Sequence, residues 1–150
     1  MNITLQKFSL RDISQKYIRW LRDKELTKYT EINSPTKNQI VEYVSLNIND
    51  KNVNFFKIIL NKKIHIGNLR IKHLKKRQAT IALIIGDKRF KNKGLGNISL
   101  RLALNFLKKN KTKIVFAYIN SKNLPSQKIF KKNGFIRSKK ETELYSVYLK

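Results

Sequence analysis

The chain has no cysteine and little of the other chemistry that holds metal ions. Without cysteine it can form no disulfide, no thiolate nucleophile and no cysteine-based metal site. Histidine occurs only at His65 and His73, and Asp and Glu together number 9 in 150 residues. We therefore expect no dedicated metal site, because too few imidazole and carboxylate groups are available to build one.

Long apolar runs are missing as well. No run approaches the ~20 residues of a membrane span, and the first residues, MNITLQKFSLRD, are too polar for the core of a signal peptide. We expect a cytoplasmic protein that does not enter a membrane. The composition, 41% hydrophobic and 10% aromatic, is typical of globular proteins. The length is that of one ordinary domain, so residues 1–150 are expected to form a single domain.

The shortage of acidic residues leaves a net charge of +25. A field of this sign attracts nucleic acid, anionic lipid or phosphorylated small molecules alike. Abundant Lys, Asn and Ile are also typical of proteins from AT-rich genomes, and lysines spread along the chain need not form a patch. Both explanations of the charge stay open.

Proline and glycine are scarce, and no linker or repeat interrupts the chain. Helix-like spacing of apolar residues occurs in 12–23, 34–48, 95–110 and 124–133. Strand-like runs occur in 3–10, 55–60, 64–71, 79–86, 113–119 and 141–149. The predicted order is roughly βααβββαβαββ, a mixed α/β fold. Runs 55–60, 64–71 and 79–86 predict an antiparallel meander, and the nearly all-apolar third run predicts a central strand covered on both faces.

Residues 84–100, IIGDKRFKNKGLGNISL, place a basic loop with two glycines between a strand and a helix. Such a loop presents free main-chain N–H groups, the positive end of a helix dipole and nearby cations to one point. Gly94 and Gly96 let the main chain approach an anion closely. The spacing does not fit a Walker loop, and it does not fit the dinucleotide pattern because position 99 is Ser. A phosphate site is predicted, and a solvated turn is the alternative.

The segments IALIIGDKRFKNKGLGNISLRLALNFL and KIVFAYINSKNLPSQKIFKKNGF together resemble the GNAT superfamily of acetyl-CoA-dependent N-acetyltransferases. The family loop [Q/R]-x-x-G-x-[G/A] corresponds to residues 91–96, with Lys91 in place of Gln or Arg. The later N-x-x-S and G-F motifs correspond to Asn123 with Ser126 and to Gly134 with Phe135. YIRWLRDKELTKYTE and IHIGNLRI resemble the branch that acetylates ribosomal proteins, polyamines or amino sugars.

The resemblance implies a GNAT-like domain in which helices flank a central, mostly antiparallel, twisted sheet. It also implies that N–H groups of residues 92–97 hold the diphosphate of coenzyme A, and that the pantetheine arm lies beside residues 84–86. The implied coenzyme-binding residues are Ile84, Ile85, Gly86, Lys91, Asn92, Lys93, Gly94, Leu95, Gly96, Asn97, Asn123 and Ser126. Asn123 and Ser126 could instead simply cap the short helix.

Acetyl transfer needs a donor for the negative charge that develops on the carbonyl oxygen, and a base for the amine. By resemblance, the N–H of Ile85 is the donor. Many relatives carry a Glu that acts as the general base. The corresponding positions have no carboxylate here, and one of them holds Tyr118. His65, His73 and Glu31 are candidate bases, and water is the alternative. Strict alternation would place both histidines on one strand face with Leu69 and Ile71.

The usual acid is missing too, because Phe130 occupies the position of a Tyr that protonates the leaving group in many relatives. The leading function is N-acetylation of a primary amine on a small molecule such as an amino sugar. Alternatives are a protein N-terminus as acceptor, or a non-catalytic acyl-CoA- or nucleic-acid-binding module.

No sequence signature of a nucleic-acid-binding module occurs, so sequence-specific recognition is not expected. Clustered lysines away from the loop would favour nucleic acid, whereas a cavity beside Tyr29, Glu31 and the histidines would favour a small acceptor. A monomer and a homodimer are both open.

Overall fold

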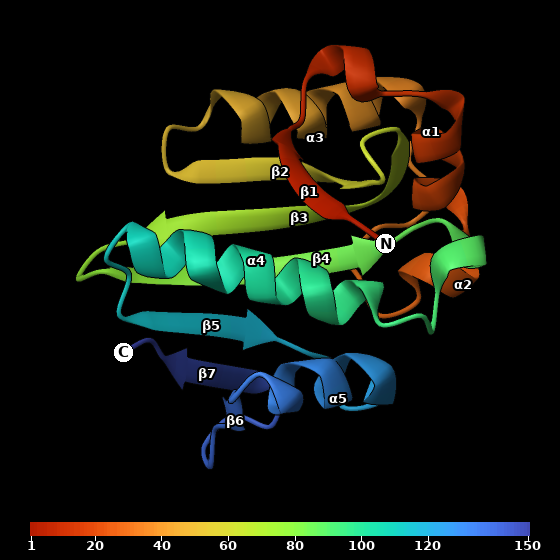
Figure 1. The fold of residues 1–150 in the computed structure, drawn as a ribbon. Coiled ribbons are helices and arrows are strands. Elements are labelled where there is room, and N and C mark those ends of the chain that lie inside the picture. The colour runs from red at the N-terminus through yellow and green to blue at the C-terminus, as the bar shows by residue number, and fades with distance from the viewer.

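The computed structural model describes residues 1–150, and one seven-stranded sheet organises the whole chain (Figure 1). Its strand order is β1-β2-β3-β4-β5-β7-β6, and every neighbouring pair is antiparallel except β4 and β5. The strands are β1 (Ile3–Lys7), β2 (Val53–Leu60), β3 (Ile64–Leu74), β4 (Gln78–Ile85), β5 (Ile114–Tyr118), β6 (Ile136–Arg137) and β7 (Leu144–Tyr148).

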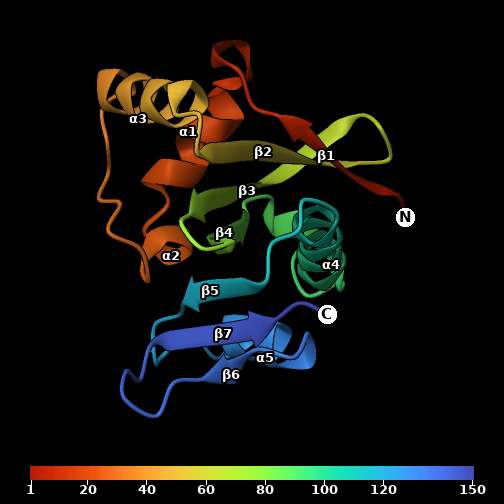
Figure 2. The ribbon, with the colours of Figure 1, turned by 90° about the vertical axis from the view of Figure 1, so that its left-hand side faces the viewer.

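Helices cover the two faces of the sheet unequally (Figure 2). They are α1 (Gln15–Arg22), α2 (Lys24–Thr27), α3 (Lys37–Asn49), α4 (Leu95–Lys109) and α5 (Leu124–Lys132), with short 3-10 turns at η1 (Leu10–Asp12) and η2 (Lys88–Phe90). Helices α1 to α3 lie on one side of the sheet, and α4 and α5 lie on the other. The predicted mixed α/β class and the rough element order are confirmed, with the short helix α2 as an addition. No helix has both the length and the apolar character to cross a membrane.

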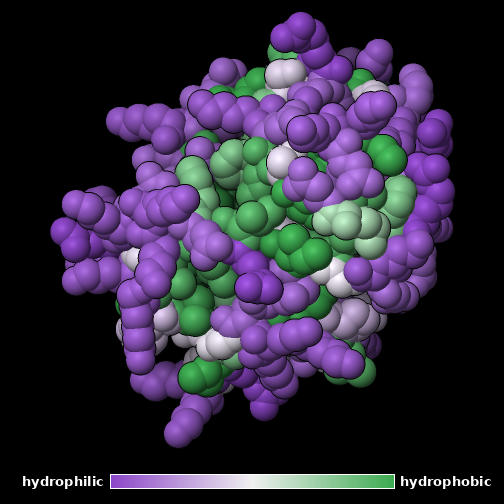
Figure 3. Space-filling view, in the orientation of Figure 1, coloured by the Kyte–Doolittle hydropathy of each residue, from purple (hydrophilic) through white to green (hydrophobic).

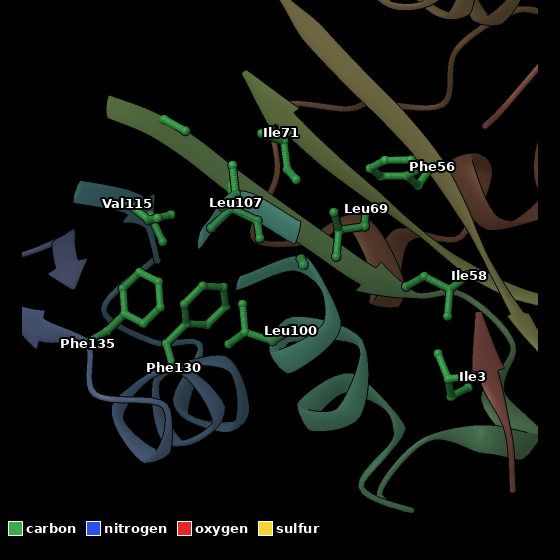
Figure 4. Packing of buried hydrophobic residues seen from close by; sticks show 14 of the residues in the cluster. Ile3, Phe56, Ile58, Leu69, Ile71, Leu100, Leu107, Val115, Phe130 and Phe135 are labelled. Carbon is green, nitrogen blue, oxygen red and sulfur yellow. The ribbon is translucent and has the colours of Figure 1, made fainter. Parts of the chain in front are cut away.

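The main core lies between the sheet and helices α4 and α5 (Figure 4). Leu100, Ala103 and Leu107 of α4 are fully buried against the strands, and Phe130 of α5 packs on Phe135 with ring centroids 4.9 Å apart. Burying a leucine of this kind contributes about 1.5–3 kcal/mol relative to leaving it in water. This core fixes the start of α4 against the end of β4.

Two expectations about the sheet are corrected. Strand β4 is central, but it is not covered on both faces, because Ala82 is exposed and Ile84 is half-buried on the side that α1 to α3 leave open. Nor do both histidines share a face with Leu69 and Ile71. One extra residue, Ile66, bulges out of the β2–β3 pairing and turns His65 to the opposite face, towards α1.

The helix starts also differ from the prediction. Helix α1 begins after its cap Ser14 rather than at residue 12, because Asp12 instead accepts hydrogen bonds from Ser9 and pairs with Lys57 at 2.7 Å. Helix α3 begins after Thr36, whose side chain forms a capping box with Gln39, rather than at Ser34 and Pro35.

His65 lies in an aromatic cluster that joins α1 to the bulged strand. Its ring centroid is 4.9 Å from that of Trp20 and 5.9 Å from that of Phe8. Its Nε2 donates to the carbonyl oxygen of Gly67 and to Oδ1 of Asn68, at 2.9 and 3.1 Å. Both partners are acceptors, so this nitrogen carries the proton. Burial in the cluster lowers the pKa of His65.

A pH-dependent stability follows from this lowered pKa. The unfolded chain binds a proton at His65 near its ordinary pKa of about 6.5, whereas the folded chain resists it. The contribution of neutral His65 to the free energy of unfolding is therefore complete well above pH 6.5. It is lost as pH falls through 6.5 towards the folded pKa. Urea unfolding between pH 5 and 8 should show a smaller loss of stability in His65→Gln than in the wild type. Equal pH slopes would contradict the assignment.

Gly67 is required by the close approach of β3 to β4. A Cβ at this position would lie 2.1 Å from the main-chain oxygen of Ile84. We expect Gly67→Ala to destabilise the fold by about 1–3 kcal/mol, because a backbone atom in a sheet cannot move aside easily. The matched control is Gly96→Ala, whose Cβ would meet side-chain atoms alone, the nearest being the Ile129 methyl at 3.3 Å. Thermal unfolding should separate the two variants, and equal melting temperatures would refute the requirement.

Candidate active site

The site is built where β4 separates from β5. The two parallel strands pair only at Gln78–Ile114, Ala79–Val115 and Thr80–Phe116. Beyond Thr80, β4 continues to Ile85 with β3 as its only partner. One edge of residues 81–85 is therefore open in the middle of the sheet. An open main-chain edge can pair with an extended ligand as it would with another strand.

A tight hydrogen-bond arrangement ends β4 at this opening. The main-chain N–H groups of Gly86 and Asp87 both donate to the carbonyl oxygen of Ile66, at 2.8 and 3.1 Å. The indole of Trp20 fills the space beside Gly86, where a Cβ would lie only 2.2 Å from the ring. The absence of a side chain at Gly86 thus lets α1 pack directly against the end of β4.

The loop after β4 is braced by Asp87. Its buried carboxylate accepts hydrogen bonds from the main-chain N–H of Arg89 and from its guanidinium, the shortest at 2.7 Å. These hydrogen bonds lower the pKa of Asp87. Lys88 reaches Asp23 at 2.8 Å and so ties the loop to the start of α2. The charges of Arg89 and Lys88 are thereby largely compensated, and Lys91 and Lys93 are the loop cations without a carboxylate partner.

Six consecutive main-chain N–H groups, those of residues 92–97, have no hydrogen-bond acceptor in the chain. The first bond of α4 runs from the N–H of Ile98 to the oxygen of Gly94. Asn92 and Gly94 have φ angles of 59° and 76°, which turn the chain sharply into the helix. A Cβ on Gly94 would meet nothing within 4 Å, so the space above the helix start is open. This geometry suits an anion with several oxygens.

The floor of the loop is held by α5. Gly96 lies against Ile129 and the side chain of Ile85, and the Asn97 side chain accepts a hydrogen bond from Asn133 at 2.7 Å. Leu95 is buried beneath the same turn. The first residues of α4 thus pack on the protein through Leu95, Gly96 and Asn97, which leaves their main chain to face outward.

The opposite wall of the opening is the start of α5. The Oδ1 of Asn123 accepts a hydrogen bond from the N–H of Ser126 at 3.3 Å, so Asn123 does cap the helix. Its Nδ2 has no partner in the chain, and neither does the Ser126 hydroxyl. Capping therefore leaves both side chains with a free donor. Phe130 is 4% exposed in the core and has no hydroxyl to offer.

The structure does not bring the candidate bases together. His65 and His73 are eight residues apart on β3, about 26 Å along an extended strand. His73 bonds Asn54 at 2.6 Å near the far end of the sheet. Glu31 is exposed in the connector after α2 and makes no hydrogen bond or ion pair. The catalytic roles of all three, and of Ile85, stay predictions.

An open cavity of about 410 Å³ lies between α1 and the loop after β4. Its lining residues are Lys16, Arg19, Trp20, Asp23, Gly86, Asp87, Lys88 and Arg89. Tyr29, Glu31 and the histidines are not among them, so this cavity is not the one beside those residues that would have favoured a small acceptor. No cluster of three or more His, Asp or Glu side chains able to hold a metal is present.

Asp87 and Trp20 shape this site, yet sequence reasoning gave neither a role in it. A signal existed for Asp87, because it is the only acidic residue between positions 51 and 140. A single carboxylate among many cations indicates a specific ion pair. No local pattern predicts that Trp20 packs on Gly86, because the two residues are far apart in the chain.

Comparison with solved structures places the fold among acetyltransferases. A domain from Methanocaldococcus jannaschii has 24% identity and a TM-score of 0.84, with 99% of each chain covered. Aminoglycoside acetyltransferase AAC(6')-Ib in complex with coenzyme A has 16% identity and a TM-score of 0.84, covering 98% of this chain and 95% of that chain.

Spermidine N-acetyltransferase from Vibrio cholerae, in complex with coenzyme A and spermine, has 15% identity and a TM-score of 0.83, covering 98% of this chain and 94% of that chain. No curated protein sequence matches the chain. The profile of the family described as "Acetyltransferase (GNAT) domain" matches residues 2–136. The chain therefore belongs to the GNAT family and is an acetyl-CoA-dependent N-acetyltransferase.

Proposed function

We propose that this enzyme acetylates a primary amine of a small molecule such as an amino sugar. The observation that carries the proposal is the row of six unpaired N–H groups beside the open edge of β4. Together they offer an anion site next to a strand-like slot. A phosphorylated, extended acyl carrier has both complementary parts.

The N–H groups of residues 92–97 hold the coenzyme diphosphate, and Lys91 and Lys93 add positive charge beside them. The open edge at Ile84, Ile85 and Gly86 receives the amide-bearing arm. The free donors of Asn123 and Ser126 face it from the start of α5. The fit is supported by Gly94, beside which no atom fills the space.

Bound acetyl-CoA supplies an activated acetyl carbonyl and a thiol leaving group. The N–H of Ile85 is the donor for the negative charge on that carbonyl oxygen, a contribution of about 3 kcal/mol in comparable sites. The two carboxylates nearest the opening, Asp23 and Asp87, are paired with Lys88 and Arg89, so the attacking amine gives its proton to water, and the departing thiolate takes one from water. Phe130 keeps the region under α5 dry and cannot serve as an acid.

The cavity beside the opening supports a small, polar acceptor. Four cations and two carboxylates line it together with Trp20, which suits a ligand with hydroxyl and amine groups. AAC(6')-Ib has been solved with coenzyme A and kanamycin, and the Vibrio enzyme with spermine. Those two relatives hold amine-bearing small molecules on the same fold, which favours this acceptor class.

The loop assignment predicts the effect of Gly94→Glu. A carboxylate placed above the free N–H groups should occupy them and repel the diphosphate, and weaken acetyl-CoA binding at least 100-fold. The fold should survive, because a side chain here enters open space. Gly94→Asn is the uncharged control, since Asn tolerates a positive φ, and it should stay within about tenfold of the wild type. Calorimetry showing unchanged affinity in Gly94→Glu would contradict the assignment.

The acceptor class is tested by thiol release with a panel of amines. Amino sugars should be acetylated faster than polyamines or peptides with a free N-terminus. With water as the base, kcat/KM should rise with pH until the amine is neutral, near its own pKa. Faster turnover of peptides would reassign the acceptor. If none of the amines in the panel caused thiol release, the proposed function would be contradicted.

A further inference from the structure

Half of the sheet has one face without helices. Helices α1 to α3 cover β1 to β3 on their side, but no helix lies on that side of β5, β7 and β6 (Figure 2). Inward residues of these strands, such as Val115 and Tyr145, are buried under α4 and α5. Their neighbours in the sequence point to the uncovered side by strand alternation. We call this surface the open face.

Aromatic side chains stand on the open face. Tyr148 is 71% exposed at the end of β7, and Phe116 of β5 is partly exposed one row further in. The register continues across the sheet from Tyr148 to Ile114, Gln78 and Leu74. This row lies at the end of the sheet where β4 and β5 are paired, away from their opening. Exposed aromatic rings on a bare sheet are the platform on which single-stranded nucleic acids stack their bases.

Cations gather at the same end of the sheet. The β3–β4 turn, the end of α4 and the chain terminus meet there, because Lys113 donates its N–H to Arg77 and accepts one from Leu149, at 2.8 and 2.7 Å. We define the basic end as the exposed residues Lys72, Lys75, Lys76, Arg77, Lys108, Lys109, Lys111, Lys113 and Lys150. Hydrophilic side chains project from this end in Figure 3.

None of these cations is neutralised within the fold. The four salt bridges of the chain all involve other residues. Among the Asp and Glu side chains, only Asp50 lies near this end, in the turn before β2. Glu141 and Glu143 precede β7 and so lie at the other end of the sheet. The basic end therefore carries nine cations without a carboxylate partner and only one nearby carboxylate.

The basic end is separate from the coenzyme loop. The loop enters α4 at its first residue and the basic end lies at its last, which places them about 22 Å apart for a helix of this length. A ligand here would leave the open edge of β4 free. The basic end is thus not explained by acetyl-CoA binding.

We propose that the basic end and the adjoining open face bind single-stranded nucleic acid without sequence preference. The lysines and Arg77 contact successive phosphates, and Tyr148 stacks on a base, with Phe116 beside it. Strand spacing of about 4.8 Å places the ends of β3, β4, β5 and β7 within roughly 15 Å, a span of two to three nucleotides. An anionic membrane would use the cations but has no need of an aromatic ring lying on a sheet face.

The β3–β4 turn allows a variant that removes charge without damaging the fold. Lys76 and Arg77 have φ angles of 59° and 58°, which Asn and Gly adopt more readily. Lys76→Asn with Arg77→Gly should therefore fold at least as well as the wild type. The matched control is Lys62→Gly with Lys63→Gln, in the β2–β3 turn at the other end of the sheet, where Asn61 and Lys62 also have positive φ.

The probe is a fluorescently labelled, unstructured 20-nucleotide oligouridine, followed by anisotropy at several salt concentrations. The turn variant should bind more weakly, and the slope of log K against log salt should become shallower by about 0.7 for each phosphate that is no longer neutralised. The control should match the wild type. Tyr148→Ala should weaken binding roughly tenfold with little change in the salt slope.

Acetyl-CoA turnover should be unchanged in the turn variant. Failure of the nucleic-acid proposal is therefore distinguishable from failure of the proposed function. Equal losses of affinity in the two turn variants would overturn the proposal, because binding would then follow net charge alone. Wild-type affinity in Tyr148→Ala would overturn it as well, and so would absence of binding or tighter binding to anionic vesicles than to the oligonucleotide.

Discussion

The separation of β4 from β5 is the constraint on which the rest of the structure depends. Two parallel strands that stay paired would leave no place for an acyl carrier inside the sheet. Here the carbonyl oxygen of Ile66, at the bulge, accepts hydrogen bonds from the N–H groups of Gly86 and Asp87 and so holds β4 to β3. Gly67 permits the close approach of the two strands. The other edge of β4 stays free, and the chain enters α4 with its N–H groups exposed.

Charge is distributed to serve this geometry. Asp87 uses its carboxylate to hold Arg89, and Asp23 holds Lys88, so two loop cations shape the main chain. The cations at the opposite end of the sheet have no such partners, and their field extends into solvent. A net charge of +25 therefore has different consequences at the two ends of α4: internal bracing at the loop and an unpaired surface at the basic end.

The order of elements and the turn into α4 could be predicted because both depend on local pattern, whereas the assignment of that turn to coenzyme A rests on the family resemblance. Apolar spacing marked the strands, and Gly94 with Gly96 marked the turn into α4. Features that depend on residues distant in the chain could not be predicted in this way. A single inserted residue, Ile66, reversed the face of His65, and one side of β4 is bare because α1 to α3 reach only its end, at Gly86. Helix α1 begins after Ser14 rather than at residue 12, since Lys57 from a distant strand pairs with Asp12.

The central claim is that main-chain amides at the start of α4 bind the coenzyme diphosphate. The most direct measurement is a titration of ¹⁵N-labelled protein with coenzyme A, following every amide resonance. The account predicts that the largest shifts occur at residues 92–97 and that residues 81–86 shift next, along the open edge of β4. Largest shifts at the basic end, or none in residues 92–97 at saturation, would contradict it.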